Sequence, residues 1–376
     1  MPQSTAAVLR GPAESADFTT ERPVDIETVD VAEPTGEEVL VEMGTASLCH
    51  TDVAMTLGHL DEQYPLVMGH EGAGYVRAVG EDVDRVAPGD MVVLGRTSCG
   101  QCKHCRQGHS NLCEQRGEAR RAGALRTGNV RFGLGGEPVH HCHGVSSFTE
   151  YTIVTQEVAV GVTDDLPIEQ ASLLGCGVFT GAGAVMNTAD IEAGADVVVF
   201  GCGGVGLTAV QAADVRGAGE IIAVDVVPEK LDRARELGAT ATINSSEVDP
   251  VEQVRELTDG GADYAFEVVG QVPVIEQAVD SLSPLGTAVL VGVPPQGVHE
   301  TELNFFDMVV GEQTIVGSFN GSYDLPTAIP TLAEMVVDGR FEVEPLITGQ
   351  RTLSEINGAI AELETGTGIR QLILPE

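Results

Sequence analysis

The second half of the chain alternates apolar runs with helical runs, and this alternation restricts the possible folds more than any other feature. It begins at about Asp196 and continues to about residue 293. The expected strands are 197–200, 220–225, 242–246, 263–270 and 287–293, and the expected helices are 207–215, 229–237, 250–257 and 273–282. Fully apolar strands that alternate with helices form a parallel sheet with helices on both faces. The predicted fold class is therefore α/β, with a doubly wound parallel sheet in this half.

Residues 1 to about 175 have a different rhythm. Short β-like runs at 38–42, 74–79, 91–94 and 149–154 are interrupted by glycine, proline and acidic residues. This pattern is typical of an irregular β domain. After the alternating region, 353–365 is expected to form a helix and 371–374 a strand. A chain of 376 residues is long enough for two domains of ordinary size.

Four cysteines, Cys99, Cys102, Cys105 and Cys113, lie within fifteen residues. Thiolates at such intervals can converge on one tetrahedral Zn²⁺, which leaves no open position for chemistry. The alternatives are a disulfide pair or unrelated thiols. The chain starts with no positive region followed by a long apolar one, so a reducing, cytoplasmic location is expected and disulfides are disfavoured. We predict a structural zinc lobe at 99–113.

Charge excludes some partners. There are 57 acidic residues against 20 basic ones, a formal charge of −37, and only Lys103 and Lys230 are lysines. Such a surface repels nucleic acid and anionic lipid, and no apolar run approaches the length of a membrane span. The carboxylates are dispersed along patterned sequence, which argues against a disordered acidic tail. The composition predicts a halophilic protein whose surface repulsion is screened by molar salt.

A glycine-rich motif follows the expected strand 197–200. It reads Gly201-Cys202-Gly203-Gly204-Val205-Gly206, and the next strand ends in Asp225. In this context the glycines permit a tight turn, approach of a pyrophosphate and close helix packing, and the helix N-terminus favours an anion. Asp225 is expected to accept hydrogen bonds from the adenosine ribose and to favour NAD over NADP. An ordinary turn, and a strand-end turn residue at Asp225, are the alternatives.

The other cysteines are Cys49, Cys142, Cys176 and Cys202. Cys202 lies inside the glycine motif, which indicates packing. Two thiolates and an imidazole, from Cys49, Cys176 and His70, have the composition of a catalytic zinc site with a free fourth position. Because the three residues are far apart in sequence, their spacing alone leaves this site open.

The motifs GHEGAG, the cysteine lobe, GCGVFTG and GCGGVG occur in the order found in zinc-dependent medium-chain alcohol dehydrogenases. The chain resembles this family over nearly its whole length, and SSFTEYTIV and INSSEVDPV resemble the glutathione-dependent formaldehyde dehydrogenase branch. The resemblance implies a GroES-like catalytic domain at 1–177 and 325–376. It implies a Rossmann coenzyme domain at 178–324.

The resemblance also assigns roles to single residues. It implies that Cys49, His70 and Cys176 bind catalytic zinc, that Glu71 is a carboxylate able to approach the metal, and that Thr51 takes the proton of the alcohol. It implies that His50 and Arg370 contact the coenzyme pyrophosphate, that Lys230 contacts the ribose and that Thr180 contacts the nicotinamide. Four further positions are implied to bind the coenzyme: Val268, Val291, Val293 and Phe319.

Two departures from the family pattern matter, and a third segment differs from it. Ala54 replaces the histidine that ends the proton relay of many relatives, so the proton must leave through the ribose to water or through His50. Arg116 lies near the arginine that grips glutathione in the thiol-adduct enzymes, but its surroundings differ. In the tract 140–143 the family has apolar pocket residues at Cys142 and His143, which predicts a more polar pocket here.

The predicted function is the reversible oxidation of an alcohol to an aldehyde or ketone by hydride transfer to NAD, with two zinc ions per subunit. Oxidation of a thiol–formaldehyde adduct is the alternative within enzymes. A zinc-binding relative without catalytic activity is the alternative from another class, and the intact set of Cys49, His70 and Cys176 argues against it. The resemblance implies a homodimer or a homotetramer.

Overall fold

A computed structural model describes residues 2–15, 17, 18, 20–294, 297, 298, 300–366 and 368–375. The chain divides into two compact units. The first comprises Met1–Cys176, Tyr323–Gly339 and Leu346–Glu376, and the second comprises Gly177–Ser322 and Arg340–Pro345. The chain therefore enters each unit more than once.

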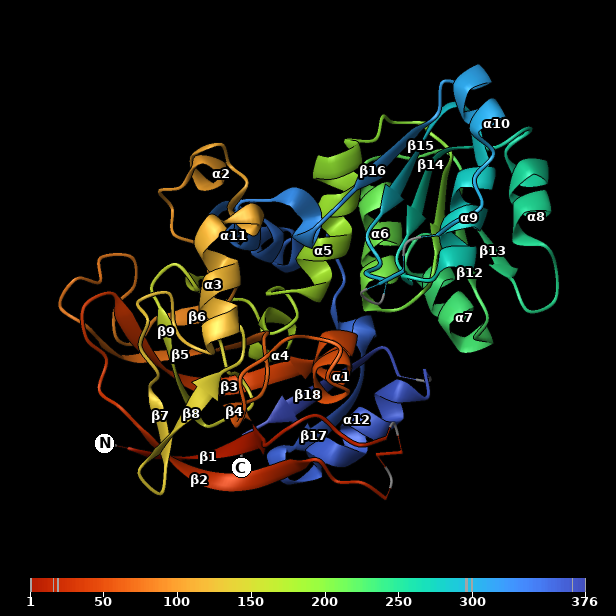
Figure 1. The fold of residues 1–376 in the computed structure, drawn as a ribbon. Coiled ribbons are helices and arrows are strands. Elements are labelled where there is room, and N and C mark those ends of the chain that lie inside the picture. The colour runs from red at the N-terminus through yellow and green to blue at the C-terminus, as the bar shows by residue number, and fades with distance from the viewer. Residues whose placement is uncertain are drawn as a thin grey trace. The chain divides into compact units, whose positions relative to one another are not determined.

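The first unit is mainly β structure and contains two sheets (Figure 1). A five-stranded closed barrel has the strand order β1-β2-β7-β8-β4, and a seven-stranded sheet has the order β10-β6-β5-β3-β18-β17, with β9 paired to β3. The strands are β1 (Gln3–Leu9), β2 (Val24–Val31), β3 (Glu38–Leu48), β4 (Leu66–Val67), β5 (Gly72–Val79), β6 (Met91–Leu94), β7 (Phe132–Leu134), β8 (Glu137–His141), β9 (Tyr151–Thr155), β10 (Ala159–Gly161), β17 (Ile347–Thr352) and β18 (Arg370–Leu374).

Helices and short turns complete the first unit. Its helices are α1 (His50–Thr56), α2 (Lys103–Arg106), α3 (Glu114–Ala122), α4 (Ile168–Ala171), α11 (Leu325–Val337) and α12 (Ile356–Glu364), and the 3₁₀ turns are Ser110–Leu112 and Leu353–Glu355. One buried core lies between α1, α12 and the strands β1, β3 and β18, and includes Leu48, Met55, Phe148 and Ile360. This core fixes the N-terminal end of α1, where Cys49 lies.

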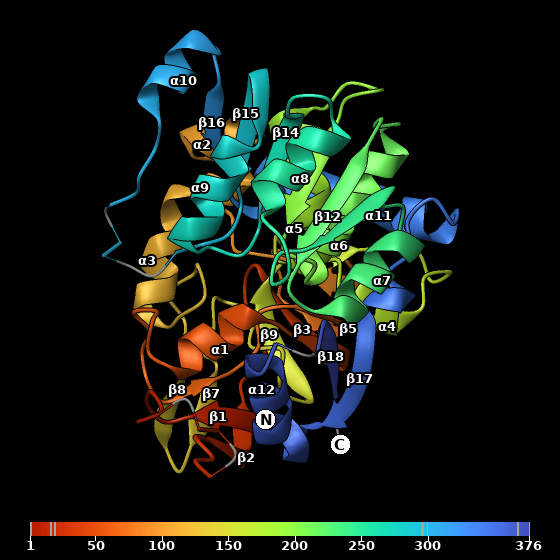
Figure 2. The same ribbon diagram turned by 90° about the vertical axis from the view of Figure 1, so that its right-hand side faces the viewer.

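The second unit is the α/β unit that the alternating sequence predicts (Figure 2). Its six-stranded sheet has the order β13-β12-β11-β14-β15-β16, and every pair in it is parallel. The strands are β11 (Val197–Phe200), β12 (Ile221–Asp225), β13 (Ala241–Asn244), β14 (Ala262–Glu267), β15 (Leu282–Leu290) and β16 (Thr314–Gly317). The order 3-2-1-4-5-6 is that of a dinucleotide-binding doubly wound sheet, so the predicted fold class is confirmed.

The helices of the second unit are α5 (Gly177–Gly183), α6 (Gly204–Val215), α7 (Pro228–Glu236), α8 (Pro250–Leu257), α9 (Val272–Asp280) and α10 (Phe305–Val310). A π-helical segment, Ala184–Ala189, continues α5, and Asn320–Ser322 forms a 3₁₀ turn. Because parallel crossovers are right-handed, the connections from β11 to β13 and those from β13 to β15 place their helices on opposite faces of the sheet. No helix in the described ranges is long and apolar enough to cross a membrane.

Candidate active site and zinc centres

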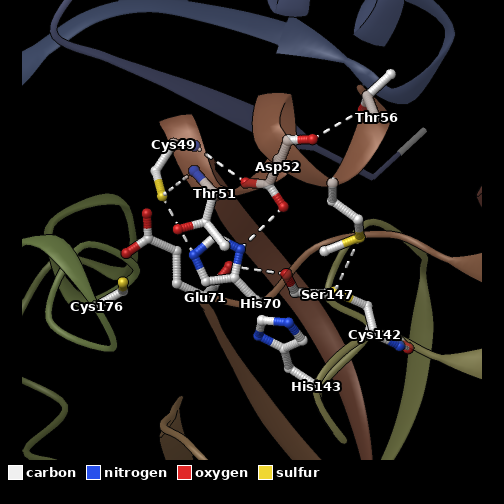
Figure 3. A network of polar contacts seen from close by, with 12 residues as sticks. Cys49, Thr51, Asp52, Thr56, His70, Glu71, Cys142, His143, Ser147 and Cys176 are labelled. Atoms are coloured by element: carbon white, nitrogen blue, oxygen red, sulfur yellow. Dashed lines mark hydrogen bonds and ion pairs between the residues drawn. The ribbon is translucent and has the colours of Figure 1, made fainter. Parts of the chain in front are cut away.

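Cys49, His70 and Cys176, which are far apart in sequence, meet in the first unit (Figure 3). Their ligand atoms lie within 4.8 Å of one another, and Cys49 Sγ is 3.2 Å from His70 Nε2. A tetrahedral zinc bound by one sulfur and one nitrogen at ordinary bond lengths places these two atoms about 3.5 Å apart. All three side chains are buried. The donor set and its spacing therefore fit a zinc ion that has three protein ligands.

Strand pairing explains why these three residues converge. Cys49 follows β3 and His70 precedes β5, and the two strands pair with Ala46 opposite Gly72. The loop that carries Cys176 approaches the end of β6 at Gly175, where a Cβ would lie 2.2 Å from the carbonyl oxygen of Leu94. Only glycine permits this approach, so Gly175 sets the position of Cys176.

Asp52 orients the imidazole of His70. Its Oδ1 lies 2.9 Å from His70 Nδ1, which directs Nε2 toward Cys49, and its Oδ2 accepts a hydrogen bond of 3.1 Å from the backbone N–H of Cys49. Burial lowers the pKa of His70, but the charges of Asp52 and Cys49 outweigh burial and raise it well above 6.5. A carboxylate behind a ligand histidine is a common arrangement at zinc sites. The sequence prediction missed Asp52, although its place three residues after Cys49 is the signal of a helix capping box.

Glu71 lies beside the three ligands, as Figure 3 shows, with its carboxylate directed between Cys49 and Cys176. Its side chain is fully buried, and Oε1 accepts from Arg370 Nη1 at 3.2 Å. Burial lowers the pKa of Arg370, but the negative groups of Glu71, Cys49 and Cys176 outweigh burial and raise it. Arg370, predicted as a coenzyme contact, is thus placed at the metal site.

The first turn of α1 carries the other predicted catalytic residues. The backbone N–H of Thr51 donates to Cys49 Sγ at 3.4 Å, and the Thr51 side chain is half-buried. His50 is exposed. Ala54 lies one turn further along α1 and offers no group for proton transfer.

A polar cluster lies near the imidazole of His70. The ring of His143 is centred 6.0 Å from the ring of His70, and its Nε2 is 3.2 Å from Glu62 Oε1. Arg120 Nη1 donates to the same Glu62 oxygen at 2.8 Å. Burial lowers the pKa of His143 to about 4, so this imidazole is neutral at pH 7. The sequence prediction identified His143 but missed Glu62, which no motif marks.

The remaining members of the tract 140–143 have separate environments. Cys142 is buried, and its thiol donates to Met55 Sδ at 3.8 Å. His141 Nε2 accepts from the backbone N–H of Arg131. Within the described residues, ligand-bearing side chains converge at only two places, and the tract belongs to neither.

The second set of converging ligand side chains is the cysteine lobe. The sulfur atoms of Cys99, Cys102, Cys105 and Cys113 lie within 4.8 Å of one another. Cys102 Sγ is 3.5 Å from Cys105 Sγ, and Cys99 Sγ is 4.0 Å from the same atom. Four thiolates around one zinc lie about 3.8 Å apart, whereas a disulfide requires about 2 Å. Backbone N–H groups of Cys105 and Glu114 lower the pKa of Cys102 to about 6. The lobe therefore fits a closed, four-thiolate zinc site.

The glycine motif lies in the second unit, between β11 and α6. Gly201 has φ +101°, a left-handed conformation that favours glycine. A Cβ at Gly206 would lie 1.7 Å from the Gly201 carbonyl oxygen, whereas a Cβ at Gly203 would meet no atom within 4 Å. Helix packing thus requires glycine at 206, and Gly203 leaves the backbone open on one side. Gly204 and Val205 form the first turn of α6, where N–H groups are available to an anion.

Other predicted coenzyme residues lie at the carboxyl edge of the same sheet. Asp225, at the end of β12, accepts from the N–H of Cys202 at 2.7 Å and from the N–H groups of Val226 and Val227. Val268 follows β14 and lies against Gly201 and Gly206. Val291, which is buried, and Val293, which is exposed, follow β15. Phe319 follows β16 and Lys230 lies in the first turn of α7, and both are half-buried. This edge is where ligands bind in doubly wound sheets.

Thr180 lies on α5, away from this strand edge in sequence. Its hydroxyl oxygen is buried and has no hydrogen-bond partner among the residues that the structure describes. Next to it, Gly181 allows α5 to pack closely on α6, since a Cβ there would lie 2.1 Å from the Val205 carbonyl oxygen. The close packing of the two helices therefore fixes the position of Thr180 relative to α6.

Comparison with known proteins agrees with both units. Residues 35–164 match the family described as "Alcohol dehydrogenase GroES-like domain", and residues 204–334 match "Zinc-binding dehydrogenase". An S-(hydroxymethyl)glutathione dehydrogenase of Escherichia coli O139:H28 is 39% identical over 362 residues, covering 95% of this chain and 97% of the relative. The protein of the same name from Photobacterium damsela subsp. piscicida is also 39% identical and covers 99% of both chains.

Solved structures show the same relationship. An alcohol dehydrogenase zinc-binding domain protein from Burkholderia ambifaria superimposes with a TM-score of 0.94 at 39% identity. Benzyl alcohol dehydrogenase from Acinetobacter calcoaceticus does so with a TM-score of 0.93 at 34% identity. Each alignment covers 100% of both chains. The fold, the two zinc-binding sets and these relatives together establish that the chain belongs to the zinc-dependent medium-chain alcohol dehydrogenase family.

Proposed function

We propose that the protein oxidises an alcohol to an aldehyde or ketone, reversibly, with NAD as hydride acceptor. The observation that carries this proposal is the buried set of Cys49, His70 and Cys176, which provides three metal ligands and leaves a fourth position for substrate. The intact set also argues against a zinc-binding relative without activity.

The side chains around this set would each have a defined task. Zinc held by Cys49, His70 and Cys176 supplies Lewis acidity that lowers the pKa of a substrate alcohol, and NAD supplies the hydride acceptor. Asp52 holds the His70 ring with Nε2 directed toward the metal position. The Thr51 hydroxyl accepts the proton of the alcohol. Because Ala54 cannot carry the proton further, we assign its exit to His50, which is exposed on the same helix turn, or to water beside the ribose.

We propose that Glu71 is a reserve carboxylate for the metal. Its pairing with Arg370, at 3.2 Å between Oε1 and Nη1, holds the carboxylate beside the site. Arg370 and His50 would also contact the coenzyme pyrophosphate. Thr180, Val268, Val291, Val293 and Phe319 would form the nicotinamide side of the coenzyme site, and Lys230 the ribose side.

Two substrate classes are supported, and one assay separates them. The curated relatives act, by name, on S-(hydroxymethyl)glutathione, and a solved relative acts on benzyl alcohol. The polar pair of His143 and Glu62 favours a substrate with a polar group near the metal site. The test is NADH formation in molar KCl from primary, secondary, aromatic and polyol alcohols, and from formaldehyde with and without a thiol.

We expect turnover of simple alcohols without added thiol. Formaldehyde oxidation that requires glutathione, together with inactivity on simple alcohols, would assign the thiol-adduct reaction. Inactivity on the whole panel in a preparation that contains two zinc ions per chain would contradict the proposed function.

Coenzyme choice should depend on Asp225. We expect Asp225→Gly to raise the kcat/KM ratio for NADP over NAD by at least about tenfold, because it removes a carboxylate that opposes a 2′-phosphate. Both coenzymes should bind less well, since Asp225 also accepts from the N–H of Cys202. The ratio is therefore the informative quantity, measured at the lowest salt that preserves the fold.

Asp225→Asn is the matched control. It removes the charge but retains an oxygen that can accept from the backbone, so its ratio should rise with a smaller loss of NAD affinity. A wild-type enzyme that strongly prefers NADP in molar KCl would show that Asp225 does not face the ribose.

We also propose that the protein is a homo-oligomer in a reducing compartment, the cytoplasm. Apolar side chains of α10 are exposed, with Phe305, Phe306 and Val309 each at least 70% accessible. Strand β16 beside them is the edge of its sheet and offers unpaired backbone groups to a second chain. All eight cysteines are free thiols, which suits a reducing environment.

A further inference from the structure

Arg96 contacts the catalytic metal site from a side that no motif marks. Its Nη2 donates to Cys176 Sγ at 3.6 Å. Arg96 lies two residues after β6, whose last residue, Leu94, packs against Gly175. The backbone N–H of Gly95 donates to the Val158 carbonyl at 2.8 Å. The same close packing that positions Cys176 therefore positions the guanidinium group beside it.

Each of the two cysteine ligands has an arginine as a hydrogen-bond donor. Arg370 donates to Cys49, whose Sγ also accepts from the backbone N–H of Thr51 at 3.4 Å. Cys176 Sγ accepts from a charged guanidinium group. A hydrogen bond from a charged donor is roughly twice as strong as a neutral one and draws more electron density from the acceptor. Arg96 therefore makes Cys176 a weaker electron donor toward a bound metal than it would be without this hydrogen bond.

Charge balance gives this contact a second consequence. With zinc bound, the thiolates of Cys49 and Cys176 balance the ion. Arg370 pairs with the carboxylate of Glu71, and Arg96 adds a second positive charge beside Cys176. Removing Arg96 would make the surroundings of the site more negative, which opposes the loss of a proton from the substrate alcohol.

We propose that Arg96 is a positioning residue that weakens electron donation from Cys176 and so lowers the pKa of the reacting alcohol. This inference rests on the proposed function, because it assumes that Cys49, His70 and Cys176 bind the catalytic metal.

The test replaces zinc by Co²⁺, whose near-ultraviolet absorption reports thiolate-to-metal charge transfer. Removing a hydrogen bond from a thiolate raises the energy of its electrons, so the band moves to longer wavelength. We expect this shift for Arg96→Met and a smaller one for Arg96→Gln. Arg96→Lys, which retains a charged donor, should lie nearer to wild type than Arg96→Gln does.

Arg121→Met is the matched control, because it removes an exposed arginine of the same unit that belongs to neither zinc-ligand set. Arg121→Met should have the same spectrum as wild type. The bands of the four-cysteine lobe should stay at the same wavelength in every variant. A second readout is the pH profile of kcat with zinc, which reports groups in the enzyme–substrate complex and whose acid-side midpoint should rise by about one unit or more in Arg96→Met and less in Arg96→Lys.

The outcomes distinguish a failure of the proposed metal site from a failure of the role proposed for Arg96. If the wild-type spectrum contains only bands of the four-cysteine lobe, the metal assignment within the proposed function fails. If it contains both sets of bands, and Arg96→Met and Arg96→Gln coincide with wild type in spectrum and pH profile, the role of Arg96 is overturned while the function stands. Should Arg96→Met not retain cobalt, the order of Arg96→Lys and Arg96→Gln decides in the same way.

Discussion

Cys49→Ser is expected to reduce turnover by more than about a thousandfold while the protein remains folded. Lewis-acid stabilisation by a catalytic metal contributes several kcal/mol, and each 1.4 kcal/mol corresponds to about a tenfold change in rate. Cys49 Sγ lies 3.2 Å from His70 Nε2, so its loss removes one of three closely spaced ligands. Metal analysis should find one zinc per chain in place of two, and NAD should still bind.

The matched variant is Cys102→Ser in the other metal set. The free energy of zinc binding to a small structural site is also folding free energy, about 10–16 kcal/mol in zinc-finger peptides. Cys102→Ser should therefore lose the other zinc and lower the thermal midpoint, whereas Cys49→Ser should change the midpoint little. Normal turnover in Cys49→Ser would show that the catalytic assignment is wrong.

Stability should rise steeply with salt concentration. The chain has 57 acidic residues against 20 basic ones. The Debye length is about 10 Å at 0.1 M salt and about 3 Å at 1 M, so molar salt screens repulsion between neighbouring surface carboxylates. Each kcal/mol of repulsion removed raises the midpoint by about 2–4 °C for a unit of this size, and we expect a rise of about 10 °C or more between 0.1 M and 3 M KCl.

The measurement is a thermal melt of zinc-loaded protein at both salt concentrations, with sedimentation to follow the oligomer. Dilution of salt should also loosen any interface that brings two acidic surfaces together. Sulfate should stabilise more than chloride at equal ionic strength, because excluded salts strengthen apolar burial. Equal midpoints with full activity at 0.1 M would refute the halophilic prediction and leave the dehydrogenase assignment intact.

Periodicity predicted the parallel unit well because its strands are apolar throughout and its helices are amphipathic. The alternation did not predict the sixth strand, β16 (Thr314–Gly317). Among the predicted strands the largest difference is at β15, which begins at Leu282, five residues before the expected start. The segment includes Leu285 with φ +67° and Gly286, which resemble a turn in sequence but lie inside the strand. Pairing with β14 determines that strand, and local propensity does not report such pairing.

The residues that surround the metal site were harder to predict than its ligands. Cys49, His70 and Cys176 carry recognisable motifs, but Asp52, Glu62 and Arg96 act through partners 18 to 81 positions away in sequence. Similarly, Arg340–Pro345 belongs to the second unit, where the backbone of Glu342 exchanges two hydrogen bonds with the side chain of Gln211. No local pattern in the sequence marks contacts of this range.

The pairing of β18 with β3 bears on how the protein is made. Leu372 lies opposite Ser47, so the sheet that supports Cys49 receives this strand only after some 300 further residues have been synthesised. Arg370, which balances Glu71, arrives in the same segment. The intervening second unit can bury its own core while the ribosome is still translating the rest. On the ribosome, the coenzyme-binding half therefore matures first, and the metal-binding half is completed only near the end of translation.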